Sequence, residues 1–556
     1  MSNTPTLTLE THLILPFQLE WQGRKPAATG SRAAELQRLG WAPVTHRDFA
    51  PIAAAPGSTH LSDTQGARIR YQAYNYFHPF VRAFWFNDTI VKRFRHPQLH
   101  TLEAVLGTGE RVTFRASCDL ILFQPDIAVL VLHLKSDAPL PLPTVEYCLD
   151  QLRRIYPPYI AGNDRKRCGG HYPRSLRLFD PHRHPIGEYD EAKHLDDLRQ
   201  QAETLMGGPA DDRPRHLWAP HWRALLQGIA TQPGDTCALQ ALQLGDDRAA
   251  VASLLSVQRP AGKHLADLID PGHMVRLCFA DPAGRDRLPY SQTFLADFEA
   301  RHCYDRFWYR SGESDDAPSR ILNAGYAFAW LGDAGDQGFF ANEDDGAPVI
   351  YRHIYVPMAI MAHFQKAALL VTARKLADLT PYRADGSLDP LKPGKFDTLK
   401  RHFMAFTQTY WFDEITPQEQ GIELYDLYRR HLRLQAHYDA NRQAIQDIVE
   451  YIDTQEAGRL AQEGGRLATA AHHFNWIAMI FAFASTVLAI LGLAASVLGM
   501  NTFELTEKPP VAIPSEVLQW INANLVSNIR PLTFAGIGVS MLIFIVGACL
   551  IYRKQS

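Results

Sequence analysis

The chain has 556 residues, 46% of them hydrophobic, so it is long enough for several domains and a sizeable core. Its formal net charge of -3 argues against a basic nucleic-acid surface, and we expect no nucleic-acid partner. The seven cysteines show no CxxC spacing, which is typical of a reducing compartment and argues against a disulfide framework.

Residues 1–350 mix apolar strand-like stretches with helical ones. Apolar runs at 11–17, 111–117, 118–124 and 127–134 predict strands, and the stretch 143–156 predicts a helix. Strands interleaved with helices indicate an α/β layered domain. The N-terminus shows no basic region followed by a long apolar run, so we predict no secretory signal and a cytoplasmic location for this domain.

From residue 351 the pattern becomes helical, and residues 351–416 predict a helical cytoplasmic region. Thr416 can cap a helix that begins at Pro417, with Glu419 placed to complete a capping box. We therefore predict a long stalk helix over 417–473. Its residues repeat every seven positions, as in a coiled coil: Leu424, His431, Tyr438, Ile445 and Ile452, with Leu427, Leu434, Asn441 and Ile448 three later.

Two long segments lack charged side chains. Neither 467–503 nor 531–552 contains Asp, Glu, Lys or Arg. About 20 apolar residues cross a bilayer core as a helix, so each segment can span a membrane. We predict transmembrane helices over 474–501 and 531–552, joined by an extracytoplasmic loop at 502–530 and followed by a tail at 553–556.

The tail determines the expected topology. Two spans return the C-terminus to the side of the N-terminus, and Arg553 and Lys554 fit a cytoplasmic end. We expect a multi-pass protein of the cell membrane, inner or plasma, with both termini in the cytoplasm and with membrane lipid as a partner.

The triplet Gly499-Met500-Asn501 stands at the end of the first predicted span. With a large α/β domain, a long helix entering that span, a second span and a short basic tail, the sequence resembles the CorA superfamily of divalent cation channels. The resemblance is by motif over 417–556 and by architecture before it. It implies a homopentamer whose first span lines a central pore, with the Gly-Met-Asn ring as the outer selectivity filter.

The residue chemistry agrees with this resemblance. Mg²⁺ prefers oxygen ligands and loses its water reluctantly, so a ring of Asn501 amides can hold a hydrated ion. Glu504, Glu507 and Glu516 in the loop would attract cations. The family's pore-facing positions, carried over by steps of three or four, are Asn475, Ala478, Phe481, Ser485, Ala489, Gly492 and Ser496. Phe481 would form a hydrophobic constriction.

The sequence leaves more than one interpretation for the transported ion and for the function. Leu498 stands where the family usually has an aromatic residue, and the connecting loop is longer than usual. The resemblance implies Mg²⁺, with Co²⁺ or Ni²⁺ as further ions, whereas His472 and His473 favour a Zn²⁺ carrier similar to ZntB and coupled to protons. A non-conducting membrane-anchored scaffold or sensor is a further alternative. The Gly499-Met500-Asn501 triplet can also be a simple helix C-cap. The pore-facing positions, which are small or polar except for Phe481, can also serve close packing between helices.

Two stretches of the soluble part contain residues of metal-ligand type. Cys168, His171, His182 and His184 would suit Zn²⁺ but match no common spacing. The acidic stretch 333–346 fails the EF-hand template, so we expect an ordinary surface loop. No P-loop, dinucleotide-binding, HExxH or GxSxG motif is present, so we expect neither enzymatic activity nor a cofactor.

Overall fold

The contacts in the computed structural model divide the chain into two compact units, Met1–Ile445 and Gln446–Ser556. The first contains the sheet, and the second contains most of one long helix. The structure describes residues 4–22, 30–46, 63–123, 126–157, 172–207, 218–231, 235, 237–245, 248–283, 290–309, 317–379, 393–504 and 515–521, and a few single positions beyond.

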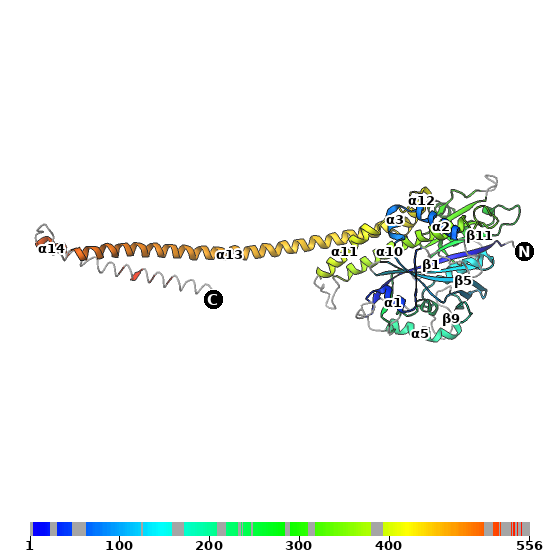
Figure 1. Ribbon diagram of the computed structural model, residues 1–556, viewed down its shortest axis with the longest axis horizontal. Coiled ribbons are helices and arrows are strands. Elements are labelled where there is room, and N and C mark those ends of the chain that lie inside the picture. Colours follow the sequence, from blue (N-terminus) through cyan, green and yellow to red (C-terminus); the bar gives the residue numbers. More distant parts are fainter. Residues whose placement is uncertain are drawn as a thin grey trace. The chain divides into compact units, whose positions relative to one another are not determined.

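A mixed sheet forms the centre of the first unit (Figure 1). In the described part it has 14 strands, with the main order β12-β13-β14-β11-β1-β6-β5-β4-β8-β9; β7 and β10 also pair with β1, and β2 joins β5 through β3. The strands are β1 (Thr6–Trp21), β2 (Ala42–Val44), β3 (Lys92–Arg95), β4 (Thr101–Val105), β5 (Arg111–Phe123), β6 (Ile127–Ser136), β7 (Leu140–Pro141), β8 (Ser175–Phe179), β9 (Pro185–Asp190), β10 (Leu239–Gln243), β11 (Ala250–Val257), β12 (Cys303–Tyr304), β13 (Ser319–Asn323) and β14 (Ala327–Asp333).

The helices are α1 (Arg32–Arg38), α2 (Asp63–Tyr76), α3 (Pro79–Trp85), α4 (Leu142–Leu152), α5 (Glu191–Gly207), α6 (Pro220–Leu225), the 3₁₀ turn η1 (Leu265–Asp267), α7 (Pro271–Phe279), α8 (Gln292–His302), α9 (Ala347–Ile350), the π-helical η2 (Tyr351–Tyr355), α10 (Val356–Ala377), α11 (Pro393–Thr409), α12 (Glu419–His431), α13 (Leu434–Glu504) and α14 (Ser515–Ile521). The helices up to α12 belong to the first unit, and most of α13 and all of α14 belong to the second.

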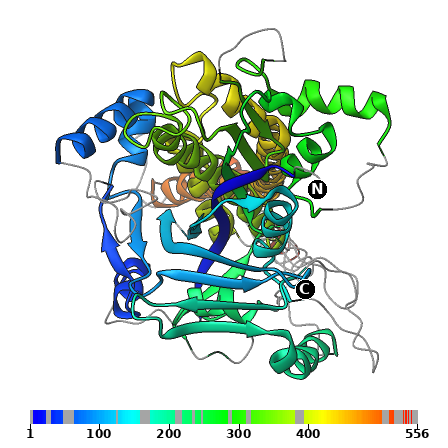
Figure 2. The same cartoon turned by 90° about the vertical axis from the view of Figure 1, so that its right-hand side faces the viewer.

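The 16-residue strand β1 separates two differently composed layers. It pairs antiparallel with β6 and β11, and Figure 2 shows it in dark blue crossing the middle of the unit. Successive side chains of a strand point to opposite faces. Leu7, Leu9 and Phe17 belong to the large apolar core, which also includes residues of α4, α6 and α7. Glu10 and His12 instead contact η2, which leads into α10.

Helix α10 is buried against β1 and β6 and contacts α11 and α12. It is apolar on nearly all sides, which is the pattern of a helix enclosed by other elements. Polar contacts fix its C-terminal end: Arg374 donates to Gln18 and, at 3.0 Å, to Glu20, and Lys375 donates to Asp126 at 2.8 Å. The helix is therefore attached to the sheet by ion pairs as well as by apolar packing.

The predicted elements of the α/β domain are largely present. The runs 11–17 and 127–134 lie in β1 and β6, and the two runs predicted from residue 111 onward are one strand, β5, which ends at Phe123. The helix predicted over 143–156 is α4, which ends at Leu152. The mixed α/β sheet domain and the long C-terminal helix are thus confirmed.

The predicted start of the stalk helix is wrong by two residues. Helix α12 begins at Glu419, and its N-cap is Gln418, whose side chain makes no capping bond. The Thr416 hydroxyl donates to the Tyr76 carbonyl and accepts from the Gln418 amide at 3.2 Å, so it holds the preceding loop to α2. Glu419 pairs with Arg306 at 3.3 Å and closes no capping box.

The stalk predicted over 417–473 is also not one helix. The chain leaves the helical conformation after His431, and Arg433 has a positive φ of 55° before α13 begins. Lys366 of α10 donates to the Leu432 carbonyl at 2.9 Å, which satisfies an acceptor exposed by the break. The sequence has no Gly or Pro at this point, so the seven-residue repeat gave no sign of the interruption.

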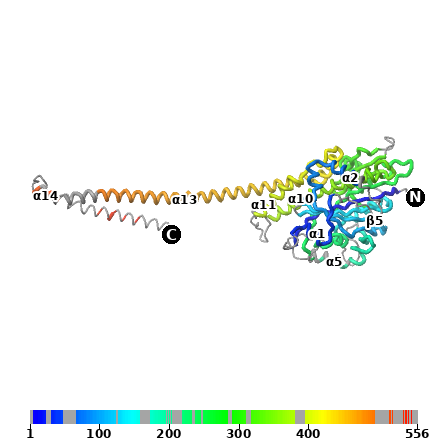
Figure 3. Tube along the Cα trace, in the orientation of Figure 1, coloured from blue at the N-terminus to red at the C-terminus, as the bar shows by residue number. Residues whose placement is uncertain are grey.

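Two helical segments in the described part are long and apolar enough to cross a membrane by length and composition, Ala347–Ala377 and Leu434–Leu493. The first contains α10 and is almost wholly buried in the sheet unit, whereas the apolar window of the second is exposed. Figure 3 traces α13 as one helix through its yellow and orange part. The span predicted over 531–552 lies outside the described residues apart from single positions.

Candidate functional site

The apolar part of α13 exposes large side chains along its length. Phe474, Met479, Phe483, Leu488 and Leu493 are each 61–75% exposed in the single chain. A soluble surface rarely carries a contiguous apolar patch of this kind, because exposed hydrocarbon is unfavourable in water. This segment therefore requires a cover, either lipid or other polypeptide.

The predicted pore-facing residues lie on an exposed side of α13. Asn475, Ala478, Phe481, Ser485, Ala489 and Gly492 are all exposed, while the side chain of Ser496 is outside the described part. The partly covered residues Ile477, Ile480, Ala484, Val487 and Leu491 also repeat at steps of three or four. At 3.6 residues per turn the two sets lie on largely opposite sides of the helix.

The Gly499-Met500-Asn501 triplet lies inside α13, which continues to Glu504. The end predicted at residue 501 is therefore three residues early, and Gly499 is helical, so the triplet does not cap the helix. Residues 499–504 make fewer than two helical turns, so their side chains project to different sides of α13. The side chains of these residues lie outside the described part.

The predicted cation-attracting glutamates fall in different places. Glu504 is the last residue of α13, Glu507 is outside the described residues, and Glu516 is exposed in the first turn of α14. The predicted loop contains the short helix α14, and the Trp520 side chain on it is 61% exposed.

The candidate zinc residues are not brought together in the described part. His182 and His184 lie in the turn between β8 and β9 with their rings 6.1 Å apart, and His184 Nδ1 lies 3.1 Å from Asp180. Cys168 and His171 lie outside the described residues. Among the residues that can be examined, no group of three His, Cys, Asp or Glu side chains is placed to hold a metal ion. His472 and His473 are exposed on α13.

The acidic stretch 333–346 closes on itself through its own carboxylates. Asp336 accepts from the amides of Gly338 and Phe339, both at 3.1 Å, and Asn342 accepts from the Asp344 amide at 2.9 Å. Backbone amides thus occupy oxygens that a calcium loop would direct at the ion. The stretch forms successive turns between β14 and α9.

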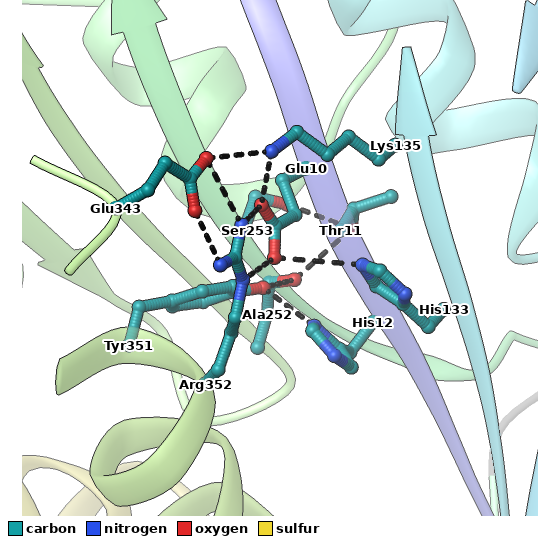
Figure 4. Close-up of polar contacts among 10 residues, drawn as sticks. All are labelled: Glu10, Thr11, His12, His133, Lys135, Ala252, Ser253, Glu343, Tyr351 and Arg352. Atoms are coloured by element: carbon teal, nitrogen blue, oxygen red, sulfur yellow. Dashed lines mark hydrogen bonds and ion pairs between the residues drawn. The ribbon is translucent and has the colours of Figure 1, made fainter. Parts of the chain in front are cut away.

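A buried ionic network in the sheet unit was not anticipated from the sequence. Figure 4 shows Arg352 of η2 reaching Glu10 on β1, with Glu343 and Lys135 beside it. The Arg352 guanidinium donates to both Glu10 oxygens at 2.6 Å and to Glu343 at 2.5 Å. Lys135 donates to Glu343 at 2.8 Å. The two positive charges of Arg352 and Lys135 are thus balanced by the two carboxylates, around the buried pair of Glu10 and Arg352.

Two stacked histidines lie beside this network. The rings of His12 and His133 are 4.3 Å apart, and His133 Nε2 lies 3.5 Å from Glu10. The Tyr351 hydroxyl donates to the Ala252 carbonyl at 2.7 Å, so its contact with His12 Nδ1 at 2.9 Å requires the imidazole to be the donor. The network joins β1, β6 and β11 to η2.

Burial and the guanidinium act in opposite directions on Glu10. Burial raises the pKa of its carboxyl, but Arg352, His133 and Lys135 together outweigh burial and hold that pKa well below its usual range. Burial lowers the pKa of His133, although Glu10 opposes this shift. The carboxylate is therefore ionised and the imidazole neutral at pH 7, which is the arrangement of a structural ion pair.

A weak sequence signal for this network exists. Glu10, Thr11 and His12 are consecutive polar residues in the middle of a largely buried strand, and a buried strand does not tolerate ionisable groups without partners. The partner could not be identified, because Arg352 is 342 residues away along the chain. Comparison of the chain with protein-family models, curated proteins and solved structures gave no match.

Proposed function

We propose that the chain is a divalent cation channel of the CorA type, assembled as a homopentamer in the cell membrane. The observation that carries the proposal is the exposed apolar segment of α13, which ends in Gly499-Met500-Asn501. Its partly covered side and its small or polar side are distinct, as expected of a helix with lipid or protein on one side and a pore on the other.

The proposed mechanism is passive permeation. Five copies of Asn501 would present amide oxygens to a hydrated Mg²⁺ ion, and the exposed Phe481 side chains would form a constriction that excludes water when closed. Inward flow of two charges gains about 4.6 kcal/mol per 100 mV of inside-negative potential, from about 2.3 per charge. The proposal involves no covalent chemistry, no enzymatic activity and no bound cofactor.

Ion flux into proteoliposomes tests the proposal. We expect voltage-driven Mg²⁺ uptake by the purified chain, and loss of uptake or of ion selectivity in Asn501→Ala. Gln462→Ala is the control, because it removes an exposed amide of α13 outside the proposed pore face and should leave uptake unchanged. Mg²⁺ uptake that Asn501→Ala leaves unchanged would contradict the role of the triplet.

The same assay separates the alternatives. The exposed His472 and His473 favour a Zn²⁺ carrier, which would show Zn²⁺ uptake that follows an imposed proton gradient and weakens when both histidines become Ala. No flux of any ion, with intact insertion into the vesicles, would favour a membrane-anchored scaffold or sensor whose sheet unit carries the function.

A further inference from the structure

A small cavity of about 30 Å³ lies in the sheet unit between α2, α3, β3 and the η2–α10 segment. Its lining includes three guanidinium groups and two imidazoles, from Arg70, Arg93, Arg352, His46 and His353, together with the ring of Trp85. Among the described residues, no carboxylate lines the cavity itself, although Asp88 contacts two of its wall groups. The wall is therefore rich in hydrogen-bond donors that can carry positive charge.

Two of the arginines and one histidine already have carboxylate partners. His46 Nδ1 lies 2.8 Å from Asp88. Arg352 is held by Glu10 and Glu343, as described above. Arg93 donates to Asp88 at 3.2 Å and to the Trp85 carbonyl, and its guanidinium lies 4.8 Å from the Trp85 ring centre. These two guanidinium groups contribute donors to the wall, but their charges are largely balanced.

Arg70 and His353 differ from the other cations in this respect. Within the described part of the chain, neither side chain has a hydrogen bond or an ion pair to a carboxylate. Arg68, two residues earlier on α2, pairs with Asp345 at 3.2 Å. Arg70 is exposed, so it lies where the cavity meets solvent, whereas His353 is only partly exposed.

The electrostatic potential at His353 is positive. Burial, followed by the charges of Arg352 and Arg70, lowers the pKa of His353 to about 4, and Glu10 opposes the shift only in part. The imidazole is therefore neutral at pH 7 and retains one N–H donor. An anion in the cavity would raise this pKa, so binding would be accompanied by proton uptake at mildly acidic pH.

We propose that this cavity binds a small oxyanion of the phosphate class, held by the Arg70 guanidinium at the mouth and by the His353 N–H, with Arg93 and Arg352 as ion-paired parts of the wall. Guanidinium forks match the geometry of phosphate and sulfate oxygens. At about 30 Å³ the cavity can admit only part of a tetrahedral oxyanion, with the remaining oxygens at the mouth beside Arg70, and it is too small for a nucleotide. The site is independent of the proposed ion pore, since all its residues belong to the sheet unit.

Isothermal titration of the purified full-length chain with phosphate at low ionic strength tests the proposal. We expect saturable binding by the wild type, about tenfold or more weaker binding by Arg70→Gln, and partial recovery in Arg70→Lys. Arg68→Gln is the matched control, because it removes a neighbouring exposed guanidinium outside the cavity and should bind like the wild type. His353→Gln should remove the proton uptake measured near pH 5 in buffers of different ionisation enthalpy.

The outcomes are distinct. Binding of sulfate as well as phosphate supports an oxyanion site. Binding of an organic phosphate ester through its phosphate group alone would indicate that the ligand is the headgroup of a lipid. The absence of binding by the wild type would overturn the proposal. So would equal affinity in Arg70→Gln and Arg68→Gln, or an identical response to chloride at matched ionic strength. Because Arg70 makes no bond in the described fold, its loss should leave the circular dichroism spectrum unchanged.

Discussion

The ion pair between Glu10 and Arg352 is buried, so each of the two residues contributes strongly to stability. The Glu10 side chain is 4% exposed and that of Arg352 is 12% exposed, so water cannot replace either partner. Breaking a buried pair by removing one charge costs about 3–5 kcal/mol, because the other charge stays desolvated. We expect Glu10→Gln to lower the free energy of unfolding by about 3 kcal/mol in guanidinium titrations.

The control for this prediction is Glu343→Gln. Glu343 contacts the same guanidinium, but its side chain is 54% exposed, so its loss should cost about 1 kcal/mol or less. Equal effects of the two substitutions would show that burial does not decide the contribution of the pair.

Buried histidines give the sheet unit a defined pH dependence. Burial lowers the pKa of His221 to about 3 and that of His363 to about 4, from a usual value of 6.5. The unfolded state therefore binds protons first, so stability is full above pH 6.5 and falls as pH decreases toward 4. We expect the thermal midpoint to fall between pH 7 and 5, with a smaller slope in His221→Gln and His363→Gln. A midpoint independent of pH over this range would contradict neutral buried imidazoles.

At the scale of elements, the break between α12 and α13 depends on one unusual backbone conformation. Arg433 has a φ of 55°, which costs a non-glycine residue roughly 1–2 kcal/mol. We expect Arg433→Gly to raise the free energy of unfolding by about 1 kcal/mol. Arg442→Gly, at an exposed helical position of α13, should lower it by about 1 kcal/mol. A destabilising Arg433→Gly would indicate that the chain is helical through this point.

Elements that are determined by the pattern of neighbouring residues could be predicted from the sequence. Features that depend on contacts with residues far away in the chain could not. The period of two in β1 and the apolar composition of β6 and α10 are local, so their positions were recognised. The break at Arg433 depends on Lys366 of another helix, and Thr416 is diverted from capping by the Tyr76 carbonyl. The predicted pore face was carried over from the family resemblance by helical spacing, whereas Arg70 and His353 become neighbours only through folding.

On the scale of the whole molecule, two apolar helices have opposite surroundings. Segment Ala347–Ala377 is enclosed by the sheet unit, and segment Leu434–Leu493 exposes its apolar window. We expect the full chain to sediment with membranes and to resist carbonate extraction. A chain ending at Ile445, the boundary of the first unit, should remain in the supernatant. Recovery of that shorter chain with the membranes would show that the sheet unit binds lipid by itself.

The enclosed helix α10 also has a consequence for synthesis of the protein. A nascent chain offers its apolar helices to the membrane insertion apparatus in the order in which they are made, and α10 is made before α13. By composition alone, both qualify as spans. Every described strand of the sheet precedes α10 in the chain, so all the strand residues that α10 packs against are synthesised before it. With the membrane location proposed above, this order would allow the sheet to bury α10 and would leave α13 as the segment to be inserted.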